Sequence, residues 1–260
     1  MTIVSLKSSN RWQKTFYEIK KKGYSKIKLF TKNDIENIKK QIALILNKKN
    51  QTPRKFSKDI LSKYHQMIHK EEIHKIFTNP ENRYFKLEKK IIKKIQDNKN
   101  IEYLVQKTWH QKKFDIKFYL NKTIRKNYAA FRLARPYKLY PNDVGGAHLD
   151  LHFNNKIYQN HNILYTIWAP INGFSKKYTL RIAPNSHKKN HDIKNLVKQN
   201  RYISKIFKND YLKKFKFKRI DMQIGEVLIF HPNLLHGGSK NFGSQTRVSV
   251  DFRIYNTSLI

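Results

Sequence analysis

From residue 127 onward, the chain is a succession of short segments rich in β-branched and aromatic residues, separated by glycine, proline or asparagine. Segments of this kind are typical of strands joined by turns. Many short strands in succession predict a sandwich or a jelly roll, with any helices packed outside it. Strands are expected at residues 127–137, 147–153, 162–171, 178–184, 225–231 and 246–255.

The chain before residue 127 has a different character, because it is rich in lysine and its apolar residues recur with a helical period. Thr31 and Asp34 stand three residues apart where the segment DIENIKKQIALILNKK begins, a spacing that favours a capping box. The helical pattern recurs at residues 57–77. This part of the chain is therefore predicted to be mainly helical.

These patterns predict one domain over residues 1–260, mostly β with flanking helices. Its core is expected to be a double-stranded β-helix, a cupin-like jelly roll, formed by residues 127–260. Residues 1–126 would form the mainly helical N-terminal part. A lysine-rich stretch at 187–219 is expected to be an insertion or a lid over the core.

The net charge of the chain is +37, from 55 lysines and arginines against 18 acidic residues. Such a surplus attracts nucleic acid, anionic membranes or phosphorylated substrates. Most of the basic residues are lysines, whereas base reading and bidentate phosphate recognition favour arginine. The positive charge thus either forms a binding surface or only reflects the base composition of the genome, and both interpretations stay open.

Cysteine is absent, which excludes disulfides, thiolate zinc sites, iron–sulfur clusters and cysteine nucleophiles. A metal in this chain must therefore bind to imidazole and oxygen ligands. The first residues, MTIVSLKSSNRWQK, lack the apolar region of a signal peptide, and no later stretch is long and apolar enough to span a bilayer. A cytoplasmic protein without a membrane span is expected.

His148 and Asp150 stand two apart in an expected strand, so their side chains point to the same face and can converge on one ion. His236, near the end of a later strand, could complete a facial triad of two imidazoles and one carboxylate, which leaves three positions open on Fe(II). A zinc hydrolase could use the same three ligand types. His-x-Asp alone is weak, because chance yields about 0.4 such triplets in a chain of this composition.

Arg247 adds weight to the triad. It follows His236 by eleven residues in a weakly charged β segment, and Ser249 lies on the same face of that strand. A guanidinium and a hydroxyl in such a place can bind the distal carboxylate of 2-oxoglutarate, whose keto acid end chelates iron. The alternative is a structural ion pair with Asp251 or Glu226.

The order of motifs resembles the phytanoyl-CoA dioxygenase (PhyH) family of 2-oxoglutarate oxygenases. The resemblance rests on the His-x-Asp triplet, on IWAPINGFSKKYTLRIAPNSHKK, and on LLHGGSKN followed by TRVS. Trp168 and the Pro184, Ser186 and His187 of the second motif occupy family positions, while Asn185 stands where the family usually has glycine. The N-terminal segment KKGYSKIKLFTKNDIENIKKQI is similar to the family's opening strand and helix.

The resemblance implies that His148, Asp150 and His236 bind Fe(II) and perform catalysis with O2 on a small-molecule substrate. It also implies that Arg247 and Ser249 bind the cosubstrate 2-oxoglutarate and that Trp168 borders it. Enzymes of this chemistry that halogenate lack the carboxylate ligand, so the presence of Asp150 favours hydroxylation or a related oxidation. The substrate is expected to be small, and anionic or carbohydrate-linked.

Two other functions stay open from the sequence. A non-catalytic, basic nucleic-acid-binding protein would explain the charge and the aromatic residues that alternate with lysine in KKFKFKR at 213–219, but it leaves the triad unexplained, so nucleic acid is the less favoured partner. An inactive jelly-roll module that binds sugars would keep the fold and lack the chemistry.

Overall fold

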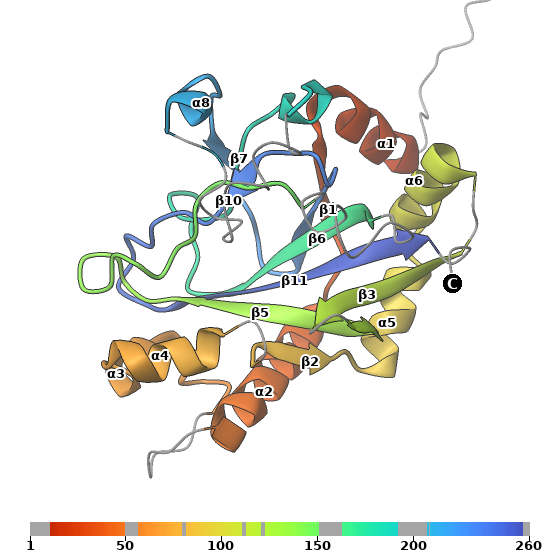
Figure 1. The fold of residues 1–260 in the computed structure, drawn as a ribbon. Helices are drawn as coiled ribbons and strands as arrows, with labels where there is room; N and C mark the ends of the chain where they lie inside the picture. Colours follow the sequence, from red (N-terminus) through yellow and green to blue (C-terminus); the bar gives the residue numbers. More distant parts are fainter. Residues whose placement is uncertain are drawn as a thin grey trace, which may run out of the picture.

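The structure of the protein is a computed structural model, shown in Figure 1. It describes residues 11–49, 57–79, 82–110, 113–120, 123–150, 163–191, 207 and 209–256. The α-helices in this part of the chain are α1 (Arg11–Lys22), α2 (Lys32–Lys49), α3 (Tyr64–Met67), α4 (Glu71–Thr78), α5 (Lys89–Gln96), α6 (Lys99–Trp109) and α8 (Asn209–Lys213). Short 3-10 helices lie at η1 (Leu61–Lys63) and η3 (Ser186–Lys188).

The strands form two antiparallel sheets. Their bounds are β1 (Tyr24–Lys28), β2 (Tyr84–Lys86), β3 (Phe114–Leu120), β4 (Thr123–Lys126), β5 (Tyr128–Ala134), β6 (Ile163–Asn172), β7 (Arg181–Ile182), β8 (Lys218–Arg219), β9 (Glu226–Phe230), β10 (His236–Gly237) and β11 (Arg247–Asn256). The large sheet has the order β1-β9-β6-β11-β3-β4, with β5 pairing to β11 and to β2. The small sheet has the order β10-β7-β8.

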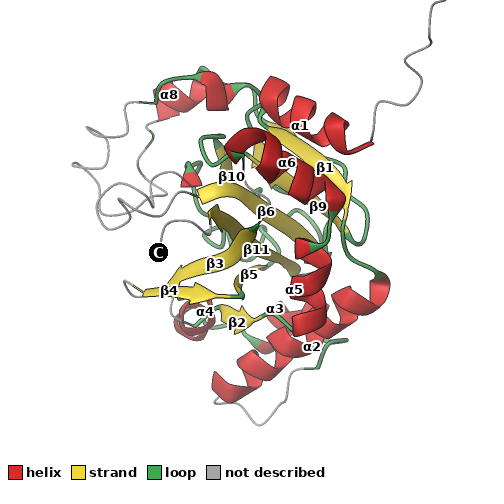
Figure 2. Ribbon diagram, turned by 90° about the vertical axis from the view of Figure 1, so that its right-hand side faces the viewer, coloured by secondary structure: helices red, strands yellow, loops and turns green. Residues whose placement is uncertain are grey.

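The two faces of the large sheet have different neighbours. Helices α1, α2, α5 and α6 lie along one face (Figure 2), and this face carries the main apolar core. Strand β11 shows the division: Val248, Val250, Phe252 and Ile254 belong to that core, while the alternate residues point to the other face. The other face, towards the small sheet, carries the candidate site.

The N-terminal part contributes strands as well as helices. The predicted capping box is confirmed, because Thr31 N donates to Asp34 Oδ2 at 2.7 Å and Asp34 N donates to Thr31 Oγ1 at 3.2 Å. Strand β1 pairs with β9, so a segment near the N-terminus lies beside one near the C-terminus (Figure 2). Strands β2, β3 and β4 join the same sheet.

The structure therefore shows a mixed α/β fold with antiparallel sheets, which confirms the predicted fold class in part. Helices account for more of the chain than a mostly β fold implies. The strand predicted at 178–184 is reduced to the two residues of β7. About half of the insertion predicted at 187–219, residues 192–206 and 208, lies outside the described residues, as does the end of the strand predicted at 147–153. The described part of that predicted strand is only an isolated bridge at His148, and Asp150 has a 3-10 conformation. None of the described helices has the length and apolar character to cross a membrane.

Candidate metal centre and cosubstrate pocket

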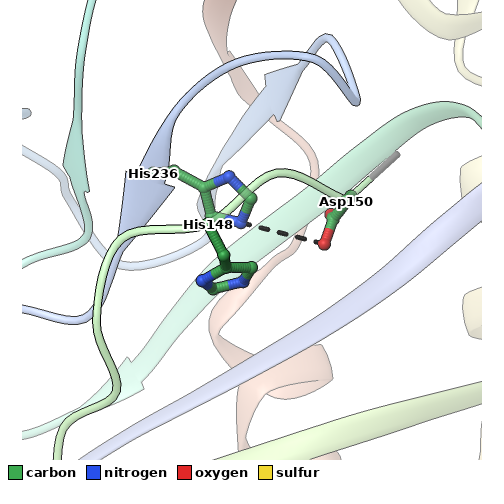
Figure 3. A group of neighbouring side chains, drawn as sticks. All are labelled: His148, Asp150 and His236. Atoms are coloured by element: carbon green, nitrogen blue, oxygen red, sulfur yellow. Dashed lines mark ion pairs between the residues drawn. The ribbon is translucent and has the colours of Figure 1, made fainter. Parts of the chain in front are cut away.

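Backbone pairing brings the two predicted histidine ligands together. His148 and His236 form an isolated antiparallel bridge, in which His148 N donates to His236 O at 2.8 Å and His236 N donates to His148 O at 3.1 Å. Directly opposed residues of an antiparallel pair carry their side chains on the same face. The two rings accordingly lie with centroids 4.4 Å apart (Figure 3).

Each imidazole is held through Nδ1. In His148 this atom lies 3.1 Å from the carbonyl oxygen of Gly146, and in His236 it lies 2.9 Å from that of Leu234. A carbonyl only accepts, so Nδ1 of each ring carries the proton and donates it. The other nitrogen, Nε2, then has a free lone pair. This is the tautomer in which a histidine binds a metal through Nε2.

Asp150 completes the group from a fully buried position. Its Oδ1 lies 3.9 Å from Nε2 of His236, the pair joined by the dashed line in Figure 3. One ligand atom from each of His148, Asp150 and His236 lies within 4.8 Å of the others. The arrangement fits one metal ion between three protein ligands, with the remaining positions open.

Two further side chains hold the carboxylate in place. Arg253 Nη2 donates to Asp150 Oδ1 at 2.9 Å, and the hydroxyl of Thr166 donates to Oδ2. Both come from neighbouring strands, because Thr166 of β6 pairs with Arg253 of β11. Outer contacts of this kind fix the orientation of a metal ligand.

The protonation states suit metal binding. Burial lowers the pKa of His148 to about 3, and it also lowers the pKa of His236, so both rings are neutral at pH 7. Burial alone would raise the pKa of Asp150, but Arg253 and the two histidines lower it below its usual value. A divalent metal therefore displaces no proton from this group at neutral pH.

Arg247 is a buried cation with no acidic partner among the described residues. Its Nη1 donates to the carbonyl oxygens of Tyr178 at 2.6 Å and Ser239 at 2.8 Å, while its buried Nε has no acceptor. The alternative, a structural ion pair of Arg247 with Asp251 or Glu226, is not observed. Asp251 pairs with Arg132 and Glu226 pairs with Lys26. Burial lowers the pKa of Arg247 to about 10, so it stays charged and suited to an anion.

The profile of the phytanoyl-CoA dioxygenase (PhyH) family matches residues 19–249. The chain belongs to this family. PhyH members are iron- and 2-oxoglutarate-dependent oxygenases, and the His-x-Asp and distant His of the family pattern are present here as one spatial group. The protein is therefore a non-haem oxygenase that uses iron and 2-oxoglutarate.

Solved structures agree on the PhyH fold. The chain is similar to the non-heme alpha ketoglutarate dependent carbocyclase SnoK from nogalamycin biosynthesis (TM-score 0.56, 10% identity, 94% of this chain and 83% of that chain). It is also similar to AviO1 from Streptomyces viridochromogenes Tue57 (TM-score 0.54, 12% identity, 95% and 96%). At such identities the likeness establishes the fold alone. No curated protein sequence gave a significant match.

The second PhyH motif has a structural role in the turn before His236. The hydroxyl of Ser186 accepts a hydrogen bond from Leu235 N at 2.8 Å, and Asn233 Nδ2 donates to the carbonyl oxygen of His187 at 3.0 Å. Asn185 has a left-handed backbone with φ of 68°. Glycine and asparagine tolerate that conformation best, which explains asparagine at the family's usual glycine position.

The remaining predicted residues share the site face of the sheet. Ser249 follows Arg247 by two residues on β11, and it is buried. Trp168 lies opposite Asp251 in the pairing of β6 with β11, and it packs in an apolar cluster with Leu228 and Phe230. Strands β6 and β11 thus place the predicted cosubstrate residues on the same side of the sheet as the triad.

Sequence reasoning missed Thr166, Arg132 and Arg253, although β11 carried a usable signal. Its alternate residues Arg247, Ser249, Asp251 and Arg253 are all polar and all buried, while the intervening ones are apolar. A strand with one apolar face and one buried, charged face is unusual, since buried charge requires partners. The pattern therefore indicates that the candidate site extends along the whole of β11.

Proposed function

We propose that His148, Asp150 and His236 hold Fe(II) and that Arg247 binds the distal carboxylate of 2-oxoglutarate. The observation that carries this proposal is the pair of imidazoles whose Nδ1 atoms are bound to carbonyls, which leaves both Nε2 atoms available beside a buried carboxylate. Bound iron and 2-oxoglutarate together supply an oxidant from O2, with release of succinate and CO2, and the substrate is hydroxylated or otherwise oxidised.

The chain's own residues define where each reactant sits. Arg247 has a buried, unused Nε and a guanidinium fixed by two carbonyls, so a carboxylate can replace the missing acceptor without a change of the arginine's position. Ser249 would add a hydroxyl to the same carboxylate. Trp168 would border the cosubstrate with an apolar surface that excludes water.

We further propose that the core of the domain is a double-stranded β-helix. Support comes from the two antiparallel sheets, since β10 of the small sheet carries His236 while β11 and β6 of the large sheet carry Arg247 and Thr166. The candidate site thus lies between two sheets, as in a jelly roll that encloses a ligand.

The nucleic-acid alternative is not favoured by the described residues. In the segment 213–219, Phe215 and Phe217 pack against a cluster that includes Leu149 and Leu235, next to the histidine ligands. Aromatic rings that bind single strands must present a face to the bases. Because these two rings pack against this cluster and are only partly exposed, they offer bases less stacking surface than the sequence suggested.

The test is a titration of the protein with Fe(II) and 2-oxoglutarate under argon, monitored by the visible charge-transfer band of the chelated complex. The band is expected in the unmodified protein and should be lost in His148→Ala. In Arg247→Ala it should require at least tenfold more 2-oxoglutarate, since one charge-assisted pair is removed. Arg125→Ala, at an exposed position of β4, is the matched control. Absence of the band in the unmodified protein would contradict the proposal.

A further inference from the structure

A second group of arginines lies beside the candidate metal centre, on the strands that carry it. Arg132 of β5 donates from Nε to Asp251 Oδ1 at 2.8 Å and from Nη2 to Oδ2 at 3.3 Å. Arg253 lies between the two acids of the site, with Nη1 3.7 Å from Asp251 Oδ2 and Nη2 2.9 Å from Asp150 Oδ1. Asp251 thus links the arginine group to the proposed iron ligand.

Arg83 belongs to this group because it interacts electrostatically with Arg132, Asp251 and Arg253, but it forms no ion pair of its own among the described residues. It precedes β2, whose neighbour β5 carries Arg132, and its carbonyl oxygen accepts from Phe131 N at 2.9 Å. Among the described residues, no carboxylate lies within ion-pair distance of its guanidinium, and its buried Nε has no hydrogen-bond acceptor. Burial and the charge of Arg132 lower the pKa of Arg83 to about 9, so the side chain remains protonated at neutral pH.

Arg135 is a structural arginine of the same fold, and carboxylates of the protein compensate its charge. This fully buried side chain contacts Asp143 through Nε at 2.9 Å and through Nη2 at 2.8 Å, and it also pairs with Glu71. Its charge is compensated within the protein. The contrast with Arg83 is informative, because Arg83 is partly buried and lacks a close carboxylate, and a charge removed from water is unfavourable unless it is compensated.

Among the residues that the structure describes, the charges around Asp251 do not balance. Three guanidiniums, of Arg83, Arg132 and Arg253, face two carboxylates, of Asp150 and Asp251. Asp150 is needed by the metal in the proposed function. Arg132 uses Nε and Nη2 for Asp251, and its side chain is still 36% exposed, which leaves Nη1 available to a ligand. The cosubstrate 2-oxoglutarate does not supply the missing negative charge, because its distal carboxylate is assigned to Arg247.

We propose that Arg83 and Arg132 bind an anionic oxygen group of the substrate, a phosphate or a carboxylate, and so make the enzyme selective for small anionic substrates. This inference rests on the proposed function of the neighbouring metal centre. Two guanidiniums that converge on one oxyanion give both charge and direction to binding. The linkage through Asp251 and Arg253 to Asp150 places the anion beside the ligand group, so that the rest of the substrate can extend towards the iron.

The test uses inorganic phosphate as the probe, titrated calorimetrically into protein that holds Fe(II) and saturating 2-oxoglutarate under argon. Acetate is titrated in parallel, so that the two experiments distinguish a phosphate site from a carboxylate site. For the preferred probe, Arg83→Gln is expected to weaken binding at least tenfold, whereas Arg83→Lys should retain part of the affinity because the charge remains. Arg125→Gln, which removes an exposed arginine, should leave binding unchanged.

A second measurement locates the probe. The 31P resonance of phosphate should broaden on binding when Fe(II) is present, because the proposed site adjoins a paramagnetic ion, and the broadening should disappear in Arg83→Gln. Equal affinity of both probes for the unmodified protein and Arg83→Gln would overturn the inference, and so would phosphate that binds without broadening. The charge-transfer band confirms that Arg83→Gln keeps its fold and its metal centre.

The two proposals can fail independently. If the charge-transfer band forms but anion binding does not depend on Arg83, only the anion site is wrong. If no band forms, the proposed metal centre fails, while Arg83-dependent heats of anion binding would still support the anion site. Nonspecific binding to the many surface lysines is recognised by its strong decrease with salt and by its indifference to Arg83→Gln.

Discussion

Arg253 Nη2 lies 2.9 Å from Oδ1 of Asp150, although the two residues are 103 positions apart in the chain. Thr166 donates to the other carboxylate oxygen, so both oxygens of Asp150 are held before any metal arrives. A ligand with few alternative orientations loses less entropy on binding. Arg253 is therefore a positioning residue for the proposed iron site, acting through Asp150.

Replacing Arg253 tests that role. We expect Arg253→Gln to weaken Fe(II) binding about 10- to 100-fold, the usual cost of removing an outer contact to a metal ligand. The measurement is an anaerobic competition with a chelator of known affinity. Arg253→Lys should recover part of the loss, and Arg125→Gln should have no effect. Unchanged Fe(II) affinity in Arg253→Gln would show that Thr166 alone orients the carboxylate.

Asp150 itself should be indispensable for substrate oxidation. Asp150→Ala removes the anionic ligand and leaves two imidazoles, so we expect turnover to fall at least 1000-fold, about 4 kcal/mol in the activation free energy. Succinate release, measured with and without candidate substrates, reports the loss. Asp210→Ala, on the exposed α8, is the control. Turnover at the wild-type rate in Asp150→Ala would show that another carboxylate binds the iron.

Asp143 supplies a pH-dependent part of the stability. Burial would raise its pKa, but His74 and Arg135 lower it from 3.8 to about 2. Because the folded pKa is below the unfolded one, this contribution of about 2 kcal/mol is complete above pH 4 and is lost as the pH falls through 2.

The substitution Asp143→Asn should therefore reduce the free energy of unfolding by about 3–5 kcal/mol at pH 7, because it leaves Arg135 buried without its main partner. Urea denaturation between pH 2 and pH 7 measures both effects. The acid-dependent loss below pH 4 should be smaller in the variant. Asp210→Asn, whose side chain is 89% exposed, should match the unmodified protein at every pH.

Gly225 closes the contact between β1 and β9. It has φ of 81°, its carbonyl oxygen accepts from Leu29 N at 3.0 Å and Phe30 N at 2.9 Å, and a Cβ here would lie 2.0 Å from Phe30 O. Gly225→Ala should lower the free energy of unfolding by at least about 2 kcal/mol, from backbone strain and overlap. Thermal unfolding measures it, with Gln223→Ala as the neighbouring control. A variant as stable as the parent would mean that the turn rearranges freely.

Local patterns in the sequence predicted local structure well. The capping box at Thr31 and Asp34, the helix after it, and the strands around Trp168 and Arg247 all depend on neighbours within a few residues. The His-x-Asp spacing likewise indicated that His148 and Asp150 could act together, although the strand expected there is only an isolated bridge at His148 and Asp150 has a 3-10 conformation. The other features follow from local backbone geometry.

Long-range pairing decided the rest. That Thr166, Arg253 and Asp150 meet depends on the register of β6 and β11, and the pairing of β2 with β5 brings the backbone of Arg83 beside Phe131, the neighbour of Arg132 in the chain. A shift of one residue in the register of β6 and β11 would turn Thr166 to the opposite face from Arg253. The sequence by itself determined which residues could bind a metal and a diacid. Only the tertiary structure decided which charges are compensated, because compensation is set by distances between strands that are far apart in the chain.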